Sequence, residues 1–555
     1  MFSDPVVGRD FFGRQEILDV LVKRAEALKG GYRQNVALIG HQQLGKTSIL
    51  RQFLHTFNDP EVLSIYVEIK LQALDYFVDQ FIRSLLYQFL KEKGPVDPTE
   101  SLAGLSLKAE PYLPQTVARI REISTHLKSR KPEEAYVKLF ELTHFVRLES
   151  GKFCIVVLDE FHRLGEFGIR NAFSDFGKRI MVQKDTMYLL SSSSFSASRK
   201  ILAEKLALLF GNFERIYLEH FDFDTSRRLI ASRLTPIQIP EAVESYLVAF
   251  TDGHPFLLQT LVSRIAEIAR SSSLTKLSEE VVARAFEELL YESQGVLNQY
   301  FSKLISPWTS SASRGSHLLI LTQLARGRNR LKDIATALNR SQREVSREIS
   351  ELMEYELVLK TGVFYRFHNK AFKFWLREVY EKKELSLLGA SEKREAFRER
   401  MTATLRDYAE LLRLDVGDRI ACLFNAFQND LVEFGEKKRQ LPRFTETLKM
   451  DISQTPAGGT RKIIAKGHGR CWVCQIVDRR ASESDVMNFV GGNRKNDAAQ
   501  TRVMIALDGF DANAKLLAKE RKVFALGLSR LNFLMDLYGL DPVVRMTEGY
   551  GNRAN

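Results

Sequence analysis

A glycine-rich segment between two apolar runs constrains the fold of this chain more than any other feature. Residues 36–39 have the continuous apolar character of a buried strand, and residues 48–54 have the periodicity of an amphipathic helix. Between them lies the pattern G-x-x-x-x-G-K-T, which begins at Gly40 and ends at Thr47. A strand, a glycine loop and a helix in this order are the context that a phosphate-binding P-loop requires, and a chance glycine loop would lack it. The segment therefore predicts an α/β domain with a site for a nucleoside triphosphate.

The residue types of this loop indicate its chemistry. Its two glycines let backbone N–H groups surround a phosphate, and the N-terminus of the following helix adds partial positive charge. Lys46 is expected to reach the β- and γ-phosphates, and the Thr47 hydroxyl is placed to ligate Mg²⁺. The loop residues predicted to bind nucleotide are Gly40, His41, Gln42, Gln43, Leu44, Gly45, Lys46, Thr47 and Ser48.

A second apolar run supports this prediction. Residues 153–158 form a continuous apolar segment that ends in Asp159 and Glu160, as expected of a buried parallel strand that opens onto a site. Solvated carboxylates often end strands, so the pattern is weak alone, but downstream of a P-loop it indicates a Walker B motif. Asp159 is then expected in the Mg²⁺ shell, and Glu160 is expected to orient and polarise the attacking water.

Two further segments fit the same sheet. Residues 62–69 and 187–191 have strand character, and strands that alternate with helices favour a doubly wound α/β domain. The second segment runs into a series of serines, of which Ser193 or Ser194 is a candidate sensor of the γ-phosphate; a plain serine-rich turn explains them equally well. Residues 91–134, by contrast, hold several prolines and show little strand periodicity, which predicts a loop and helix excursion outside the core.

Composition limits the class of protein. A chain of 555 residues suggests roughly three to four domains, and its 45% apolar and 27% charged residues are typical of soluble globular proteins. No apolar run approaches the roughly 20 residues that span a bilayer. The N-terminus lacks a secretory pattern and the four cysteines fit a reducing compartment, so we expect a cytoplasmic protein without a membrane partner. The net charge of +12 permits an acidic partner such as nucleic acid.

Three motifs resemble those of archaeal-type AAA+ ATPases, which are related to the STAND signalling ATPases. Residues 12–17 are similar to the F-x-G-R…E-L box of that family, residues 212–218 to its g-R-x-x-x-L segment, and residues 253–258 to its G-x-P motif. The P-loop departs from the family pattern at residues 41–43, where Pro and Arg are common, but its Gly-Lys-Thr is intact. The resemblance implies an ATP hydrolase with ATP and Mg²⁺ as cofactors.

The resemblance also implies roles for individual residues. Gly13 and Arg14 belong to the box that lies over the adenine in that family. Pro255 opens a lid helix that closes toward the nucleotide. Arg215 is implied to contact a γ-phosphate, either in cis or from a neighbouring subunit of a homo-oligomer.

The segment after the ATPase core is predicted to form a helical lid and a winged helix. Residues 241–300 have helical periodicity, and two more helices are expected between residues 317 and 338. A third helix follows Ser341, which is a candidate N-cap with Glu344 at capping-box spacing. Residues 358–367 then predict a hairpin with glycine at its turn.

The third helix of this module is a candidate DNA-binding element. In a winged helix it would enter the major groove, with Gln342, Arg343 and Arg347 facing DNA. Alternatively, the module packs against the ATPase or binds a protein partner, and the arginines are merely solvated. The basic face favours DNA slightly, because it adds a non-specific attraction to phosphates.

The C-terminal region is predicted to be an α/β domain. Residues 471–477 and 502–507 have strand character, and a helix is expected at residues 484–490 between them. Residues 509–518 resemble the G-F-t-x-x-A helix of restriction-endonuclease-like domains, which occur at the C-terminus of archaeal-type ATPases.

Nuclease activity places strict demands on such a domain. A PD-(D/E)xK nuclease needs an Asp on one strand and Glu-x-Lys on the next, to hold Mg²⁺ and to stabilise phosphate charge. Asp451 is the candidate for the first acid, and Gln475 and Val477 stand where Glu and Lys are needed. Because valine cannot supply the charge of lysine, we favour a degenerate domain that does not cleave DNA, although a basic side chain such as Lys462 could substitute.

The predicted architecture has four parts. They are a P-loop ATPase core at residues 1–235, a helical lid at 236–310, a winged helix at 311–385 and a restriction-endonuclease-like domain at 386–555. The leading hypothesis is an ATP-driven, DNA-associated switch, in which nucleotide state alters the winged helix and the nuclease-like domain. Two alternatives remain: a STAND-like signalling ATPase or scaffold with protein partners only, and an ATP-gated PD-(D/E)xK nuclease.

Overall fold

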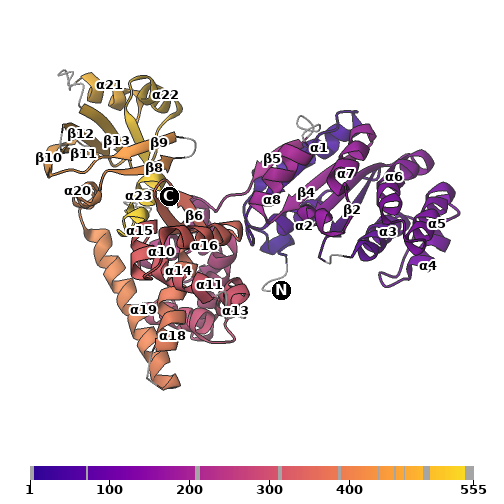
Figure 1. Cartoon of the computed structure of the whole chain (residues 1–555), viewed down its shortest axis with the longest axis horizontal. Helices are drawn as coiled ribbons and strands as arrows, with labels where there is room; N and C mark the ends of the chain where they lie inside the picture. The colour runs from indigo at the N-terminus through magenta and orange to yellow at the C-terminus, as the bar shows by residue number, and fades with distance from the viewer. Residues whose placement is uncertain are drawn as a thin grey trace. The chain divides into compact units, whose positions relative to one another are not determined.

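The computed structural model describes residues 5–70, 73–206, 213–309, 315–385, 389–434, 437–455, 458–467, 469–491 and 500–543. Contacts divide the chain into two compact units (Figure 1). The first unit contains residues 1–225 together with 254–256, and the second contains 226–253 and the residues from 257 onward. Among the described residues, no helix combines the length and the apolar character needed to cross a membrane.

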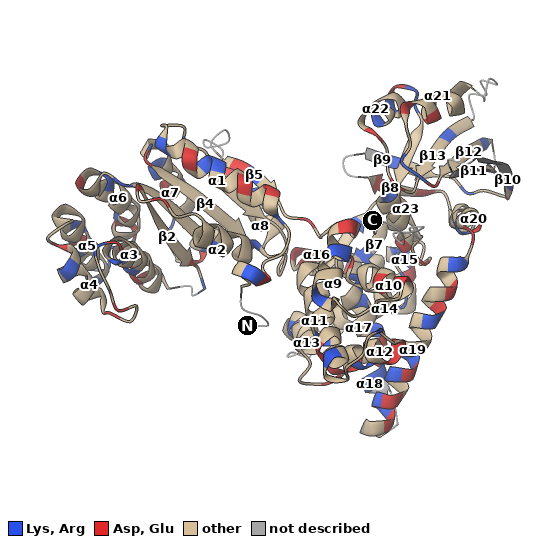
Figure 2. Ribbon diagram, turned by 180° about the vertical axis from the view of Figure 1, so that it is seen from behind, with Lys and Arg blue, Asp and Glu red and all other residues tan. Residues whose placement is uncertain are grey.

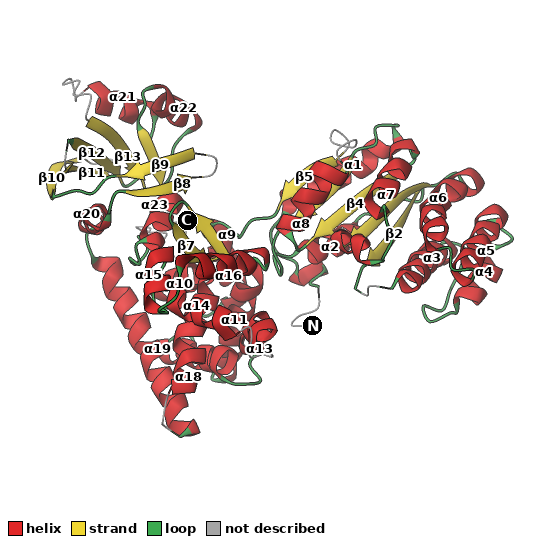
Figure 3. Ribbon diagram, in the orientation of Figure 1, coloured by secondary structure: helices red, strands yellow, loops and turns green. Residues whose placement is uncertain are grey.

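The first unit is built on a five-stranded parallel sheet with the order β2-β3-β4-β1-β5. Its strands β2, β4 and β5 are labelled in Figure 3. The strands β1, β3 and β4 are buried almost throughout, which explains why they read as continuous apolar runs. The predicted α/β class is therefore confirmed. The strands of this sheet are β1 (Asn35–Ile39), β2 (Val62–Glu68), β3 (Phe153–Asp159), β4 (Thr186–Ser192) and β5 (Phe213–Tyr217).

Each face of this sheet carries its own apolar core. The cores are separate because successive side chains of a strand point to opposite faces. One core packs under α1 (Gln15–Lys29) and α2 (Lys46–Thr56). The other packs under α3 (Leu74–Lys91), α6 (Pro132–Ser150) and α7 (Ala172–Val182). The remaining short helices of this unit are η1 (Gly8–Asp10), η2 (Phe161–Glu166), α8 (Phe195–Lys200) and η3 (Ile201–Lys205).

Residues 91–134 do not form the excursion that their prolines predicted. They contain α4 (Leu102–Ala109) and α5 (Pro114–Lys128), which pack with α3 and α6. Leu105 and Val117 are buried in the same core as β3. Proline is tolerated in the first turn of a helix, and both α5 and α6 begin with it. The prediction that this segment lies outside the core was wrong, because two of its prolines, Pro114 and Pro132, start helices that pack into the core.

The second unit begins with a group of helices followed by a hairpin. β6 and β7 of the hairpin are antiparallel. Ser341 caps α16 and forms the expected capping box with Glu344. The elements of this part are α9 (Phe223–Leu234), α10 (Glu241–Thr251), α11 (Pro255–Ser271), α12 (Glu279–Phe286), η5 (Glu287–Tyr291), α13 (Val296–Thr309), α14 (Gly315–Ala325), α15 (Leu331–Ala337), α16 (Gln342–Glu354), β6 (Val358–Thr361), β7 (Phe364–Phe367), α17 (Lys370–Trp375), η7 (Leu376–Tyr380) and α18 (Glu381–Leu385).

A long helix joins this group to the C-terminal sheet. α19 (Ala390–Arg413) packs along α10 and α12 and carries both charge signs along its length (Figure 2). Glu287, which is only 4% exposed, lies 2.6 Å from the Arg398 guanidinium. The hydroxyl of Tyr408 donates to the carbonyl of Ser245. These contacts fasten α19 to the helices beside it.

The C-terminal part contains a second five-stranded sheet, with the order β10-β11-β12-β13-β14. β11 is antiparallel to β10 and β12, whereas β12, β13 and β14 run parallel. Helices α21 and α22 pack on one face, and α20 and α23 pack on the other. The bounds are α20 (Val416–Ala426), β8 (Asp430–Phe434), β9 (Lys437–Leu441), β10 (Glu446–Thr455), β11 (Gly458–Gly467), β12 (Arg470–Val477), α21 (Glu483–Gly491), β13 (Gln500–Ala506), α22 (Ala512–Glu520), β14 (Phe524–Gly527) and α23 (Leu528–Leu537).

Candidate active site

The predicted phosphate loop joins the end of β1 to the start of α2. Gly45 has φ +90°, in the left-handed region, and directly precedes Lys46, the first residue of α2. A Cβ atom at Gly40 would lie 3.0 Å from both the Cβ and the carbonyl oxygen of Leu218. The backbone therefore requires glycine at both positions, one for its conformation and one for close packing.

Lys46 is folded over this loop. Its side chain is 5% exposed, and Nζ donates to the carbonyl oxygens of Gly40 (2.8 Å) and His41 (2.7 Å). A largely buried ammonium beside a glycine loop and a helix N-terminus favours an anionic ligand. The geometry therefore fits a phosphate at this position.

Other residues of the loop anchor it to its surroundings. Leu44 is buried in the core under α1 and α2. The ring of His41 stacks on Phe195, with ring centroids 5.8 Å apart. The Ser48 hydroxyl accepts the N–H of Val6, which ties the N-terminal segment to α2.

Asp159 is completely buried at the end of β3, where hydroxyls from three elements donate to it. Thr47 Oγ1 of α2 donates to Asp159 Oδ2 at 2.7 Å, and the Tyr66 hydroxyl of β2 donates to the same oxygen at 2.9 Å. Ser191 of β4 donates to Oδ1. A carboxylate and a hydroxyl are oxygen ligands of the kind that Mg²⁺ prefers, so Thr47 and Asp159 fit a magnesium–nucleotide complex. Burial and the Asp159 charge raise the pKa of Tyr66, which keeps its hydroxyl protonated as a donor.

Glu160 directly follows β3, and it is held by Ser193, which directly follows the neighbouring strand β4. Its φ is +61°, and Oε2 accepts both the N–H (3.0 Å) and the hydroxyl (2.8 Å) of Ser193. His162 Nδ1 lies 3.3 Å from the same oxygen and 2.9 Å from the hydroxyl of Ser192. Burial lowers the pKa of His162. Ser194, the other candidate sensor, instead caps α8 with its hydroxyl, so Ser193 is the serine that meets Glu160.

The F-x-G-R box belongs to the first unit, and so do the central residues of the G-x-P motif. Gly13 has φ +70°, and the guanidinium of Arg14 lies 4.7 Å over the ring of Phe221. Burial lowers the pKa of Arg14, although nearby acids oppose this. Residues 254–256, with Pro255 at their centre, are assigned to this unit although the helices around them belong to the second.

His254 brings the G-x-P turn to the P-loop. Its side chain is 3% exposed, and its ring centroid lies 5.2 Å from that of His220. Burial, with the neighbouring His220, lowers the pKa of His254 to about 3, while a hydrogen bond to the backbone of Gln42 opposes the shift. His254 is therefore a neutral side chain of the turn that contacts the P-loop.

Arg215 does not reach the carboxyl edge of the sheet. It lies in the middle of β5, opposite Ala37, and its side chain is exposed. The residue of β5 opposite Ile39, where the P-loop starts, is Tyr217.

A comparison with protein families decides the assignment of this unit. Residues 10–173 match the family model described as AAA ATPase domain. This part of the chain is an AAA+ P-loop ATPase. The protein is accordingly a nucleotide-binding ATPase, in which the AAA+ unit carries Lys46, Thr47, Asp159 and Glu160. A search of curated proteins finds no match.

Solved structures also show similarity, at low identity. The Walker-type ATPase PABY2304 of Pyrococcus abyssi is 18% identical, with a TM-score of 0.46 over 68% of this chain and 99% of that chain. The ORC2 protein of Aeropyrum pernix, in ADPNP–ADP complexes, is 14% identical, with a TM-score of 0.43 over 73% and 97%. The ORC1 protein of Aeropyrum pernix, in complex with DNA, is 16% identical, with a TM-score of 0.37 over 69% and 96%. The family match, and not these likenesses, carries the assignment.

The residues predicted to face DNA are all exposed, but they do not share one side of α16. Arg343 and Arg347 are four residues apart and lie on the side away from the buried Val345 and Ile349. Gln342 is the first residue of the helix and is in line with Ile349, seven residues later. The two arginines therefore share a solvent-facing surface, and Gln342 is exposed at the helix start.

The candidate nuclease residues do not lie on neighbouring strands. Asp451 is on β10, Gln475 is on β12, and β11 lies between them. In backbone register Asp451 stands opposite Arg461, and Gln475 stands opposite Lys462. The side chain of Asp451 lies outside the described residues. The predicted pairing of Asp451 and Gln475 on consecutive strands was wrong, because β11 lies between their strands and strand order is not visible in a local sequence pattern.

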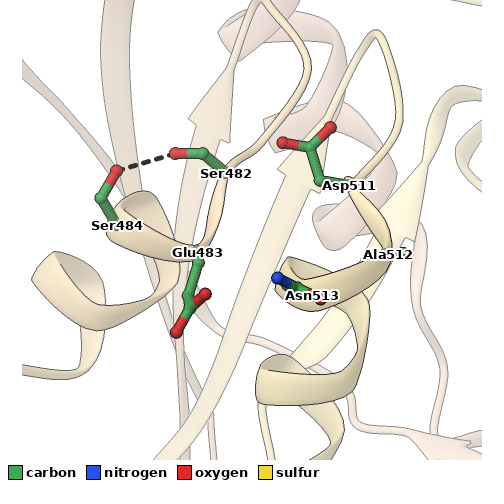
Figure 4. Close-up of a pocket in the computed structure, with 6 residues that line it drawn as sticks. All are labelled: Ser482, Glu483, Ser484, Asp511, Ala512 and Asn513. Carbon is green, nitrogen blue, oxygen red and sulfur yellow. Dashed lines mark hydrogen bonds between the residues drawn. The ribbon is translucent and has the colours of Figure 1, made fainter.

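A shallow pocket of the same domain lies between the first turns of α21 and α22 (Figure 4). Ser482 and Ser484 hydroxyls are 2.8 Å apart at its rim. Glu483 and Asp511 both line it, one from each helix. Two carboxylates oppose the binding of a phosphate, so we assign this pocket no nucleotide or nucleic-acid role.

Proposed function

We propose that this ATPase is a DNA-associated switch, in which the nucleotide held by the AAA+ unit controls a winged helix and a nuclease-like domain that does not cleave. The proposed domains are an ATPase core at residues 1–235, a lid at 236–310, a winged helix at 311–385 and a degenerate restriction-endonuclease-like domain at 386–555. The exposed polar face of α16 is the observation that carries the DNA role.

The residues of the AAA+ unit have separate roles in this proposal. Lys46 neutralises the β- and γ-phosphates, and Thr47 and Asp159 hold Mg²⁺, which when bound supplies further neutralisation of phosphate charge. Glu160 orients the attacking water and takes up its proton on the carboxylate, of which one oxygen, Oε2, accepts from Ser193. Gly13, Arg14 and Pro255 enclose the base, and Arg215 acts on a neighbouring subunit of a homo-oligomer.

Two features of the second unit support a winged helix. Three helices, α14, α15 and α16, precede the β6–β7 hairpin, which is the element order of that fold. The exposed side of α16 carries two arginines, and cations on such a helix gain affinity for DNA phosphates by releasing counterions.

The tip of the hairpin is occupied by the C-terminal domain. A Cβ atom at Gly362 would overlap the carbonyl oxygen of Leu431 on β8, and the N–H of Val363 donates to that oxygen at 3.2 Å. The ring of Phe364 packs edge-on against Tyr538 at 5.3 Å. With the hairpin engaged in this way, α16 is the part of the module that is open to DNA.

The charge distribution of the C-terminal sheet supports the loss of cleavage. β11, the strand beside β12, has no Asp or Glu in its sequence. Lys449 and Arg461 both lie within ion-pair distance of Asp415, at 2.9 and 3.4 Å. Asp415 is therefore already ion-paired, and β11 offers no acid that could replace Gln475 as a metal ligand.

The DNA role is tested by reversing the charge on α16. Binding of the full-length protein to a fluorescent duplex is followed by anisotropy as KCl is raised, with ADP and with a non-hydrolysable ATP analogue. R343E/R347E should weaken binding and reduce the slope of log K against log salt by about 2, one for each lost phosphate contact.

The matched control is R119E/R121E, which changes the net charge equally on α5 of the AAA+ unit. Both double variants should keep wild-type ATP hydrolysis. If R343E/R347E binds DNA as the control does, α16 is not the DNA-facing element. If the wild type binds no DNA even at low salt, the DNA role fails and a signalling ATPase with protein partners becomes the better explanation.

A further inference from the structure

Tyr66 is a residue of the nucleotide site that no sequence motif indicated. Its hydroxyl donates to Asp159 Oδ2 at 2.9 Å from β2, the edge strand beside β3. Thr47 and Ser191 supply the other two hydroxyls on this carboxylate. An ionised carboxylate offers about four acceptor sites. The three hydroxyls found among the described residues therefore leave one site of Asp159 for a further ligand.

Tyr66 is itself fixed at both ends. Its backbone N–H, on the free edge of the sheet, donates to Ser84 Oγ of α3 at 3.2 Å. The guanidinium of Arg51 lies 4.9 Å over its ring and 4.0 Å from the Glu68 carboxylate. Two helices thus hold the backbone and the ring of Tyr66, and in this position its hydroxyl donates to Asp159.

We propose that Tyr66 is a positioning residue for the metal–nucleotide complex: it orients the Asp159 carboxylate so that the open acceptor site faces the metal. The inference rests on the metal role of Asp159 in the proposed function. Partners that orient a metal-binding carboxylate are worth about 10–100-fold in metal affinity, because they set the direction of its lone pairs before the metal arrives.

A purely structural role predicts something different. A buried tyrosine that only completes the core would, when its hydroxyl is removed, lower stability without changing metal binding specifically. Tyr188 provides the comparison within the same sheet. It is fully buried on β4, and its hydroxyl donates to Gln183 at 2.7 Å, in a hydrogen bond that does not involve Asp159.

The experiment compares Y66F and Y188F in the full-length protein. Mn²⁺, which reports on the Mg²⁺ site by electron paramagnetic resonance, is titrated into protein saturated with ADP. ADP affinity is measured separately in EDTA, and thermal unfolding is measured without metal. Y66F should weaken Mn²⁺ binding by about 10–100-fold, with metal-free ADP affinity within about twofold of wild type. Y188F should leave Mn²⁺ affinity unchanged.

Each other outcome has a defined meaning. Wild-type Mn²⁺ affinity in Y66F overturns the inference, as does an equal loss of metal-free ADP binding, which would place the effect on the loop. If Y66F proves too unstable to titrate, Arg51→Met, which frees the tyrosine ring while leaving its hydroxyl, must weaken Mn²⁺ binding by at least a few-fold for the inference to stand. If the wild-type protein with ADP binds no Mn²⁺ at all, the metal role of Asp159 fails before Tyr66 is tested.

Discussion

Glu160 Oε2 accepts both the backbone N–H and the hydroxyl of Ser193, at 3.0 and 2.8 Å. The glutamate proposed to activate water and the serine proposed to sense the γ-phosphate are therefore partners of each other. A serine hydroxyl has one hydrogen to donate, so Ser193 cannot donate it to Glu160 and to a phosphate at the same time. If the hydroxyl turned to a γ-phosphate, the backbone N–H of Ser193 would be left as the partner of Glu160 Oε2.

Ser193→Ala should reduce the preference of the protein for ATP over ADP. A hydrogen bond of this kind contributes about 0.5–1.5 kcal/mol, which is roughly a 2–12-fold change in affinity. The measurement is calorimetric titration with ADP and with a non-hydrolysable ATP analogue. Ser194→Ala is the control, because Ser194 caps α8 instead. Equal affinity ratios in the two variants would remove Ser193 from the γ-phosphate contact.

Glu160→Gln should bind ATP but hydrolyse it poorly. The amide keeps the size of the side chain but cannot take up a proton from water, so kcat should fall by about 10²–10⁴-fold. Steady-state phosphate release, together with ATP binding by fluorescence, checks this expectation. The control is Glu166→Gln at the last residue of η2, the short helix that follows Glu160, and this variant should keep the wild-type kcat. Retention of wild-type kcat in Glu160→Gln would require another base.

Because of His254, the free energy of unfolding of the AAA+ unit should decrease as the pH is lowered. The pKa of His254 is lowered to about 3 in the folded chain, below the ordinary value of about 6.5 in the unfolded chain. Between these values the unfolded state binds the extra proton, so acid favours unfolding. The contribution of His254 is complete above about pH 6.5 and is lost as the pH falls, by about 1 kcal/mol between pH 7.5 and 5.5.

His254→Asn should remove this part of the pH dependence. Urea unfolding at pH 7.5 and 5.5 gives the free energy of unfolding at each pH. His55→Asn, an exposed histidine of α2, should keep the wild-type difference. If His254→Asn loses as much stability on acidification as the wild type, another buried group is responsible.

Gly362→Ala should lower the stability of the second unit by more than the cost of a left-handed backbone conformation alone. Gly362 has φ +63°, and an added Cβ would overlap the carbonyl of Leu431. Gly327, with φ +91° and open space around its Cβ position, carries the conformational cost without the overlap. Each variant should lose about 1–2 kcal/mol from the left-handed backbone, and Gly362→Ala should lose at least about 1 kcal/mol more. Equal losses in chemical denaturation would mean that the hairpin does not need its contact with β8.

Local motifs explain what was predictable. The P-loop and the Asp159-Glu160 strand end were visible because each is a contiguous pattern with its own backbone requirement, and the structure places both at one edge of a parallel sheet. The capping box of Ser341 and Glu344 was equally visible, because it spans a single helical turn. Tyr66 was not visible, because an alternating edge strand offers no signal that one of its side chains reaches a carboxylate on the next strand.

Two predictions that depended on strand pairing or on packing were wrong. Asp451 and Gln475 were expected on consecutive strands, yet β11 separates them, since sequence does not reveal which strand lies between two others. Residues 91–134 were expected outside the core, yet α4 and α5 complete it, since proline indicates a helix start as readily as a loop.

The sequence alone determined the presence of a P-loop for a nucleoside triphosphate, because glycine, lysine and threonine at fixed spacing specify a backbone and a charge that few other structures need. Only the tertiary structure decided which partners hold the two carboxylates of the site. Tyr66 lies on β2, Ser191 lies on β4 and Ser193 directly follows β4. Parallel pairing across β2, β3 and β4 brings their hydroxyls within hydrogen-bond distance of Asp159 and Glu160. Such contacts depend on strand order and register, which are properties of the whole sheet and of no single segment.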